Sequence, residues 1–173
     1  YRHAAKDFLL EIPAGKIDHL KRNLFFGLSA GISTTGDENI FLGDSSGSLN
    51  TMGSHNVFAG FGAGQKNFNG TWNTYIGNRS GMNSYSGNLN TFIGAYAGIN
   101  VTNGSYNTLS GTNAGYGLTT GNYNSIFGIY AGASSFSPNF TGSNNSIFGN
   151  QAGYAITTGY DNVFMGSSSG GSN

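Results

Sequence analysis

The chain of 173 residues contains no cysteine, and only 8% of its residues are charged. Without cysteine there are neither disulfides nor thiolate metal sites. The seven basic and seven acidic residues give a net charge of zero, which argues against binding to nucleic acid or to an anionic membrane surface. No apolar run approaches the roughly 18 residues that a membrane span needs. We therefore expect no nucleic-acid partner and no membrane insertion in this segment.

The few charges are concentrated at the start of the chain, where eleven of the fourteen charged residues lie at or before Asp44. Within residues 1–22, two apolar runs flank the turn signal Pro13-Ala-Gly-Lys16. We expect residues 1–22 to form a hairpin that caps the open edge of a second unit, residues 23–173. Because the chain starts at Tyr1 and stops within a repeat, we also expect a fragment of a longer protein.

Glycine is abundant, with 30 residues, and Asn, Ser and Thr are frequent. This composition is typical of disorder, but aromatic residues make up 14% of the chain and recur at fixed positions. The repeat starts with Asn, has Gly four and eight residues later, and has a third Gly three residues before the next Asn. Nine copies start at Asn23, Asn39, Asn56, Asn73, Asn90, Asn107, Asn124, Asn145 and Asn162.

The steps between successive starting Asn residues are 16, 17, 17, 17, 17, 17, 21 and 17 residues. A period of about 17 is too short for a helical hairpin and fits one coil of a β-solenoid. The sequence therefore predicts an all-β fold, a parallel β-roll or β-solenoid of about nine 17-residue coils.

The residue two after each Asn is large and apolar in every copy: Phe25, Phe41, Phe58, Tyr75, Phe92, Leu109, Ile126, Ile147 and Phe164. Because side chains alternate along a strand, this residue and the Asn share a face, which we expect to be the coil interior. Stacked Asn side chains can then bond to one another and to the turn backbone. We predict Phe92, Leu109 and Ile126 in consecutive interior rungs.

The residue three after Asn is also mostly apolar and points the other way: Phe26, Leu42, Ala59, Ile76, Ile93, Ser110, Phe127, Phe148 and Met165. A strand that is apolar on both faces must bury both. A narrow coil has one interior, so we expect a neighbouring chain to cover this face in a side-by-side homotrimer. Small residues between the first two glycines, such as Ala97 and Ala114, suggest a second strand.

The run Asn124-Ser-Ile-Phe-Gly128-Ile-Tyr-Ala-Gly132 and its eight relatives resemble the head repeats of trimeric autotransporter adhesins. They are also similar to Gly/Asn-rich repeats of trimeric tail-fibre-type proteins of phages and bacteria. The resemblance covers residues 23–170 and implies a left-handed parallel β-roll, three of which associate and bind host matrix or surface glycans outside the cell. The adhesin repeats are shorter and have one more residue between Asn and the first Gly.

Two groups of residues are candidates for ligand binding. The seventh copy carries nine residues between its second and third glycines where the others have four or five. Within this insertion we single out Phe136, Pro138, Asn139 and Phe140, which either contact a ligand or cover the seam between chains. The second group is an aromatic strip directly before the repeat Asn, formed by Trp72, Tyr106 and Tyr123 with His55. It either stacks on sugars or lies buried between chains.

Catalytic and metal chemistry find little support. The segment Gly60-Phe-Gly-Ala-Gly64-Gln-Lys66 lacks the spacing of a phosphate-binding loop, and Asn67 replaces its Ser or Thr. Three histidines without ligand spacing predict no metal site. Asp37, Glu38 and Asp44 could pair as in a glycosidase, but solvated turn residues are the simpler interpretation. We expect no catalytic residue, no metal and no cofactor.

The sequence thus favours a structural and adhesive segment of a trimeric surface or tail fibre, outside the cell or on a virion. Its partners would be two further copies of the chain and a cell-surface glycan or protein receptor. An ice-binding β-solenoid is an alternative, because Thr74, Thr91 and Thr108 recur one residue after Asn. A glycan-degrading β-helix enzyme is a third alternative, although few acid–base groups are present.

Overall fold

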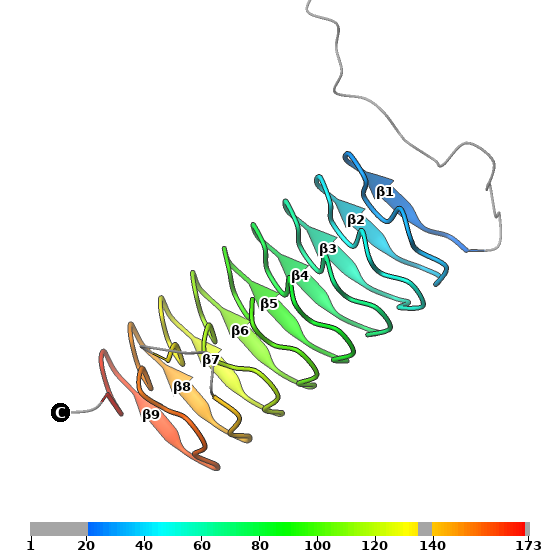
Figure 1. Ribbon diagram of the computed structural model, residues 1–173. Coiled ribbons are helices and arrows are strands. Elements are labelled where there is room, and N and C mark those ends of the chain that lie inside the picture. The colour runs from blue at the N-terminus through cyan, green and yellow to red at the C-terminus, as the bar shows by residue number, and fades with distance from the viewer. Residues whose placement is uncertain (1–20, 135–139, 172–173) are drawn as a thin grey trace, which may run out of the picture.

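The computed structural model of the protein describes residues 21–134 and 140–171. These residues contain no helix and nine strands of three residues each (Figure 1). The strands are β1 (Leu24–Phe26), β2 (Ile40–Leu42), β3 (Val57–Ala59), β4 (Thr74–Ile76), β5 (Thr91–Ile93), β6 (Thr108–Ser110), β7 (Ser125–Phe127), β8 (Ser146–Phe148) and β9 (Val163–Met165). The predicted cap cannot be compared, because residues 1–20 lie outside the described ranges.

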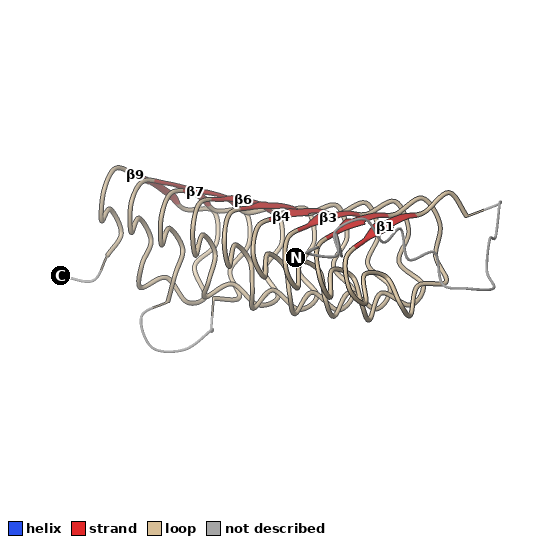
Figure 2. Ribbon diagram, turned by 90° about the horizontal axis from the view of Figure 1, so that it is seen from above, coloured by secondary structure: helices blue, strands red, loops and turns tan. Residues whose placement is uncertain are grey.

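The nine strands form one parallel sheet in which each strand pairs with the next along the chain. The coils are numbered 1 to 9 after the strand that each contains. The chain makes one turn of the solenoid between each strand and the next, so the stack makes about eight complete turns. The strands lie along one long side, and turns form the remainder of each coil (Figure 2). Phe92 pairs with Leu109, and Leu109 pairs with Ile126. The predicted all-β parallel solenoid is confirmed.

The predicted interior column, two residues after each Asn, is confirmed. Phe92, Leu109 and Ile126 are fully buried. In coils 1 to 5 the column consists of stacked rings, whose neighbouring centroids are 4.7 to 5.1 Å apart, from Phe25 to Phe92. This spacing is that of parallel strands, so each ring packs against the rings of the coils on either side.

A second interior column, eleven residues after Asn in the regular coils, was missed by the sequence analysis. It consists of Asn50, Asn67, Ser84, Val101, Leu118, Phe140 and Ile156, all buried. The segment between the second and third glycines varies in sequence and looks like a free loop. No charged residue, Gly or Pro occupies this position in any coil, which is a usable signal of burial.

The starting Asn residues form a continuous ladder through the stack. The backbone N–H of Asn107 donates to Asn90 Oδ1 at 2.9 Å, and Asn90 in turn donates to Asn73 Oδ1 at 2.9 Å. Each amide also reaches a turn, as when Asn90 Nδ2 donates to the Gly104 carbonyl at 2.8 Å. Buried amides need such partners, so the predicted Asn stacking is confirmed, and it closes each coil onto the next.

The predicted second strand is absent from the described coils. The residues between the first two glycines form turns, because the position six after Asn has a positive φ in every coil, 59° at Tyr96 for example. Gly94 has a φ of 132°, and a Cβ there would lie 2.5 Å from the Gly111 carbonyl oxygen. The backbones of successive coils therefore approach so closely that only glycine fits. Extended backbone cannot pass through two such positions.

Candidate functional site

The first candidate surface is the outer sheet face, defined as the residues one and three after each repeat Asn. The column three after Asn is apolar in most coils and exposed, with Ile76 at 41%, Ile93 at 43% and Phe148 at 36%. Phe127 and Phe148 stack across neighbouring strands at 5.0 Å between centroids. The expected outward direction of this column is confirmed, and the single chain leaves it uncovered.

The other column of the outer sheet face carries hydroxyl groups in its central coils. Thr74, Thr91 and Thr108 pair in register, and Ser125 and Ser146 continue the file. Apolar residues occupy the same position at the two ends of the sheet, namely Leu24, Ile40, Val57 and Val163. The hydroxyl file therefore covers only the middle of the sheet.

The second candidate surface is the corner column, the residue directly before each repeat Asn. Its members are Arg22, Glu38, His55, Trp72, Leu89, Tyr106, Tyr123, Asn144 and Asp161, and all have φ between 47° and 61°. This left-handed conformation projects their side chains from the corner of the coil. Trp72 is 58% exposed, Tyr106 49% and Tyr123 58%. The aromatic strip that the sequence singled out is therefore on the surface of the single chain.

The rings of the corner column stack in two separate pairs. His55 and Trp72 have centroids 4.1 Å apart, and Tyr106 and Tyr123 have centroids 4.7 Å apart. Each ring thus covers one face of its partner, and the aliphatic Leu89 separates the two pairs. The strip offers a sugar fewer free ring faces than its length suggests, because stacking uses the ring faces on which a sugar would lie.

Acidic residues take structural positions in the turns, Glu38 in the corner column and Asp44 in the turn between the first two glycines. Glu38 pairs with Arg22 on one side and accepts from His55 Nδ1 at 2.6 Å on the other. Asp44 Oδ1 accepts a hydrogen bond from the Leu28 backbone N–H at 2.9 Å. These carboxylates link successive coils, which fits their interpretation as turn residues. Within the described ranges, no group of three or more His, Asp or Glu residues is placed to hold a metal ion.

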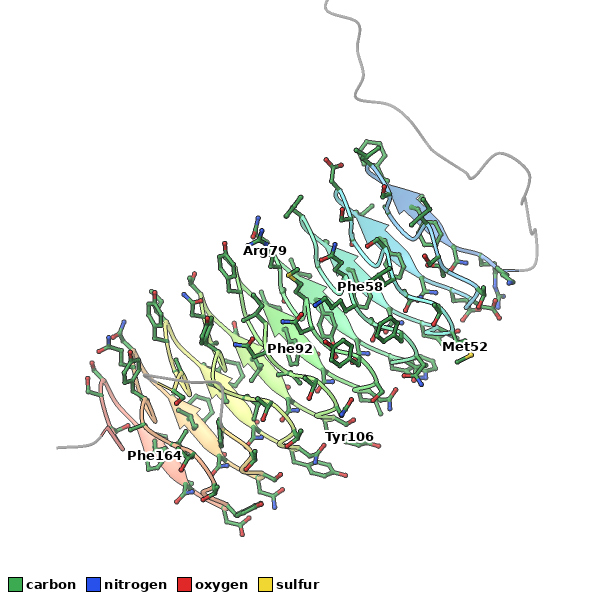
Figure 3. The ribbon with its side chains drawn as sticks, viewed as in Figure 1. Met52, Phe58, Arg79, Phe92, Tyr106 and Phe164 are labelled. Atoms are coloured by element: carbon green, nitrogen blue, oxygen red, sulfur yellow. The ribbon has the colours of Figure 1, made fainter. Side chains whose placement is uncertain are left out.

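The opposite edge of the coil stack carries a different set of side chains. In Figure 3, Arg79 projects from one edge, Met52 and Tyr106 project from the other, and Phe58, Phe92 and Phe164 lie between them. The Arg79 guanidinium lies 5.7 Å from the Phe61 ring centroid and 6.0 Å from that of Tyr96. The arginine is therefore held between two aromatic rings from the neighbouring coils.

The insertion in coil 7 begins and ends at the same point of the coil below. Ser134 lies against Gly117, where a Cβ would come within 2.5 Å of the Ser134 nitrogen. The Phe140 N–H donates to the Gly117 carbonyl at 2.8 Å, and Phe140 pairs with Leu118. Ser134 and Phe140 thus both lie against coil 6, and Phe140 continues the core there.

This arrangement changes the role of one predicted ligand residue. Phe140 is fully buried inside its own chain, above Leu118 in the second interior column. It can neither contact a ligand nor cover a seam, so its assignment to the binding group is corrected. The insertion shifts the repeat register, which hides this core position in the sequence. Phe136, Pro138 and Asn139 lie outside the described residues.

A third candidate surface is a cleft that the sequence analysis missed. It has a volume of about 320 Å³ and is lined by Asn113, Tyr116, Tyr130, Ala133, Ser134 and Tyr154. These residues belong to the turns of coils 6 to 8, and none of them lies in a strand. The tyrosines are separated in sequence and meet only through the stacking of coils, so a local motif could not reveal them.

Comparison of the chain with protein-family models, with curated proteins and with solved structures gave no match. Among the described residues there is also no helix of the length and apolarity that crossing a membrane requires. The function is therefore argued from the three surfaces themselves.

Proposed function

We propose that this chain is a structural and adhesive segment of a trimeric surface or tail fibre, displayed outside a cell or on a virion. In this function three copies associate side by side, and the exposed remainder of the coils recognises a cell-surface glycan or protein receptor. The observation that carries the proposal is the outer sheet face, which is apolar along one column and exposed in the single chain.

An uncovered face of this kind favours association. Parallel sheets generally have both faces covered, and a long apolar strip in water promotes contact with another apolar surface. A second copy offers a strip with the same repeat distance, so that side chains can interdigitate coil by coil. Closed cyclic symmetry then covers every strip, and the resemblance to trimeric adhesin and tail-fibre repeats favours three copies.

The shape of the solenoid suits a fibre. The strands stack along one axis in sequence order, and each coil contacts mainly its neighbours (Figure 1). Such a stack carries load along its axis through the strand ladder and the Asn ladder. The proposal assigns it no catalytic residue, metal or cofactor.

The test is the mass of the protein in solution. The wild-type chain should elute with light scattering at three times its mass of 18.0 kDa. Ile93→Asp places a charge at the centre of the proposed seam, where burying it without a partner is strongly unfavourable. This variant should run as a monomer, or unfold if the seam is needed for folding.

Ile129→Asp is the matched control, because Ile129 is 50% exposed in a turn away from the sheet. It should remain a trimer with an unchanged circular dichroism spectrum. A wild-type chain that is a stable monomer would contradict the proposal. So would an Ile93→Asp variant that keeps the wild-type mass.

The in-register file of Thr74, Thr91 and Thr108 supports ice binding as a second candidate function. A flat parallel sheet holds these hydroxyls one strand spacing apart on an exposed face. Apolar side chains three residues after Asn, such as Ile76 and Ile93, interrupt the polar surface beside them. Thermal hysteresis distinguishes the two functions: a freezing-point gap that Thr91→Tyr abolishes would favour ice binding, and no gap would favour the fibre.

A further inference from the structure

Three tyrosines and Ala133 come together in the cleft on coils 6 to 8. We propose that this cleft binds a single uncharged sugar ring of a larger glycan, held between Tyr116 and Tyr154. The inference rests on the adhesive function proposed above and names its ligand and its site.

The cleft arises from the order of the residues that lie nine positions after the repeat Asn in successive coils. Tyr116 of coil 6, Ala133 of coil 7 and Tyr154 of coil 8 occupy this position in turn. The backbones stack in register here, since Gly115 N–H donates to the Ala131 carbonyl at 2.8 Å and Gly132 N–H to the Ala152 carbonyl at 2.8 Å. Ala133 lacks a large side chain and is itself buried, at 2% exposed, so it lies at the base of the cleft that the two tyrosines help to line.

The width of the cleft suits one saturated ring. Two strand spacings, about 9.5 Å, separate the backbone positions of Tyr116 and Tyr154. A sugar ring in contact with both tyrosines needs about 3.5–4.0 Å between its carbon atoms and those of each tyrosine ring. The remaining thickness corresponds to one puckered ring, whose C–H faces pack against aromatic surfaces.

Polar groups at the rim supply partners for sugar hydroxyls. The Tyr130 side chain is 43% exposed, and its hydroxyl both donates and accepts. The Asn113 side chain lines the cleft, and its amide can both donate and accept hydrogen bonds. Ser134 adds a further hydroxyl at the cleft wall. The cleft thus combines aromatic side chains with polar groups, and such a combination can fix the orientation of a small ligand.

Charge selects among glycans. Between Arg79 and Asp161 the chain contains no Asp, Glu, Lys, Arg or His. A sialic or uronic acid would find no cation there, and an amino sugar with a free ammonium group would find no carboxylate. The cleft therefore suits neutral sugars.

Other coils do not repeat this arrangement. The position nine after Asn carries Ile32, Ser48, Gln65, Met82 and Ile99 in coils 1 to 5. No pair of aromatic residues flanks a small one among them. A trimer would present this cleft three times, which raises the avidity of contacts that are individually weak.

The test uses the methyl glycosides of glucose, galactose, mannose and N-acetylglucosamine as probes, with methyl glucuronide as the charged comparison. Ligand-observed NMR titration of the whole chain should detect binding of at least one neutral probe, with Kd on the order of 1 mM, and none of the glucuronide. Ala133→Tyr continues the tyrosine column and fills the cleft. Tyr154→Ala removes one wall. Each change should weaken binding at least tenfold.

Two control variants separate the cleft from other effects. Met82→Tyr places the same side chain at the same coil position outside the cleft and should leave binding unchanged. Tyr123→Ala removes a ring from the corner column and should also have no effect. Circular dichroism spectra of all variants should match the wild type, which shows that they fold.

The outcomes for the cleft and for the fibre are distinguishable. If the wild-type chain is a trimer that adheres to cells but binds no glycoside, the cleft proposal is overturned and the fibre stands. Equal glycoside binding by wild type and Ala133→Tyr also overturns the cleft. If a monomeric chain binds a neutral glycoside and Ala133→Tyr abolishes this binding, the cleft stands and the trimeric fibre does not.

Discussion

The early and late coils fill the same interior space with different pairs of side chains. In coils 3 and 4, a large ring in the first interior column lies in the same coil as a small polar residue in the second: Phe58 with Asn67, and Tyr75 with Ser84. In coil 6 the pair is aliphatic, Leu109 with Leu118. A coil of fixed backbone accepts either combination, because the two side chains together fill a similar volume.

The polar half needs hydrogen bonds that the apolar half does not. Asn67 Nδ2 donates to Asn50 Oδ1 at 2.6 Å and to the Gly70 carbonyl at 2.9 Å. The Asn67 Oδ1 atom, in contrast, is buried without a partner. In the early coils, the cost of burying polar groups offsets part of the stabilisation that burial of the rings provides. The late coils are stabilised by apolar packing, without this cost.

The largest effect on stability is expected when a polar residue is placed in the second interior column of a late coil. Leu118→Asn leaves a cavity and buries an amide between Val101 and Phe140. Its Nδ2 can reach the Gly121 carbonyl, as Asn67 reaches Gly70, but neither neighbouring side chain offers a donor to its Oδ1. We expect a loss of about 3 kcal/mol in the free energy of unfolding, measured by urea titration. Hydrogen exchange should accelerate in coils 5 to 8 more than in coils 2 to 4, because solenoid coils are coupled mainly to their neighbours.

The conservative control is Leu118→Met, which keeps the volume and should cost less than about 1.5 kcal/mol. A loss below 1 kcal/mol for Leu118→Asn would show that the late coils accept polar residues as the early ones do, and the contrast between the halves would not hold.

A smaller effect concerns the junction of the two halves at Tyr75. Its hydroxyl donates to Ser84 Oγ at 2.8 Å. Burial raises the pKa of Tyr75 above its ordinary value of 10.0, although the hydrogen bond to Ser84 acts in the opposite direction. The neutral phenol is thus favoured in the folded state. Its contribution to stability is complete below pH 10 and is lost as the pH rises further.

Tyr75→Phe should therefore cost about 1 kcal/mol at pH 7, where a hydrogen bond is lost. Between pH 7 and pH 11 the wild type should lose about 1.4 kcal/mol of stability because Tyr75 resists ionisation in the folded state, and Tyr75→Phe should not show this loss. Urea titrations at the two pH values measure both effects, with Tyr106→Phe as an exposed control. An unchanged alkaline loss in Tyr75→Phe would contradict the assignment.

The smallest effect on stability is expected when an apolar residue is placed in the second interior column of an early coil. Asn67→Val copies coil 5, where Phe92 is accompanied by Val101. The change removes the unpartnered Oδ1 atom and deprives Asn50 Oδ1 of its donor, while the Gly70 carbonyl keeps the Asn56 amide at 2.9 Å. These contributions oppose one another, so stability should change by less than about 1 kcal/mol.

Asn67→Ala serves as the control in the same urea titration and should cost more, because it leaves a cavity. A loss of 2 kcal/mol or more for Asn67→Val would mean that the Asn50–Asn67 bond is essential to the early coils.

The repeat period and the alternation within the strand made much of the fold predictable. The period gave the solenoid, and the apolar file through Phe92, Leu109 and Ile126 gave the register of the first interior column. Strand alternation also gave the outward direction of Ile93. These features are determined locally, because each depends on residues within one short strand and repeats at every coil.

The turns and the sites were decided by the tertiary structure. Residues such as Tyr96 and Trp72 adopt a positive φ that their side chains do not favour, and only the stacking of coils holds them there. That conformation excludes the second strand, which sequence alone suggested. The backbone conformation of these turn residues therefore depends on contacts between coils, which no short segment of sequence encodes.

The same reason explains the misassigned and missed residues. Phe140 entered the core because the insertion closes on Gly117 and restores the stacking above Leu118. The tyrosine cleft exists because Ala133 lies between Tyr116 and Tyr154 across three coils. The sequence by itself determined the coil and what its strand buries. The tertiary structure decided which distant residues meet, because that depends on the stacking of turns rather than on any local preference.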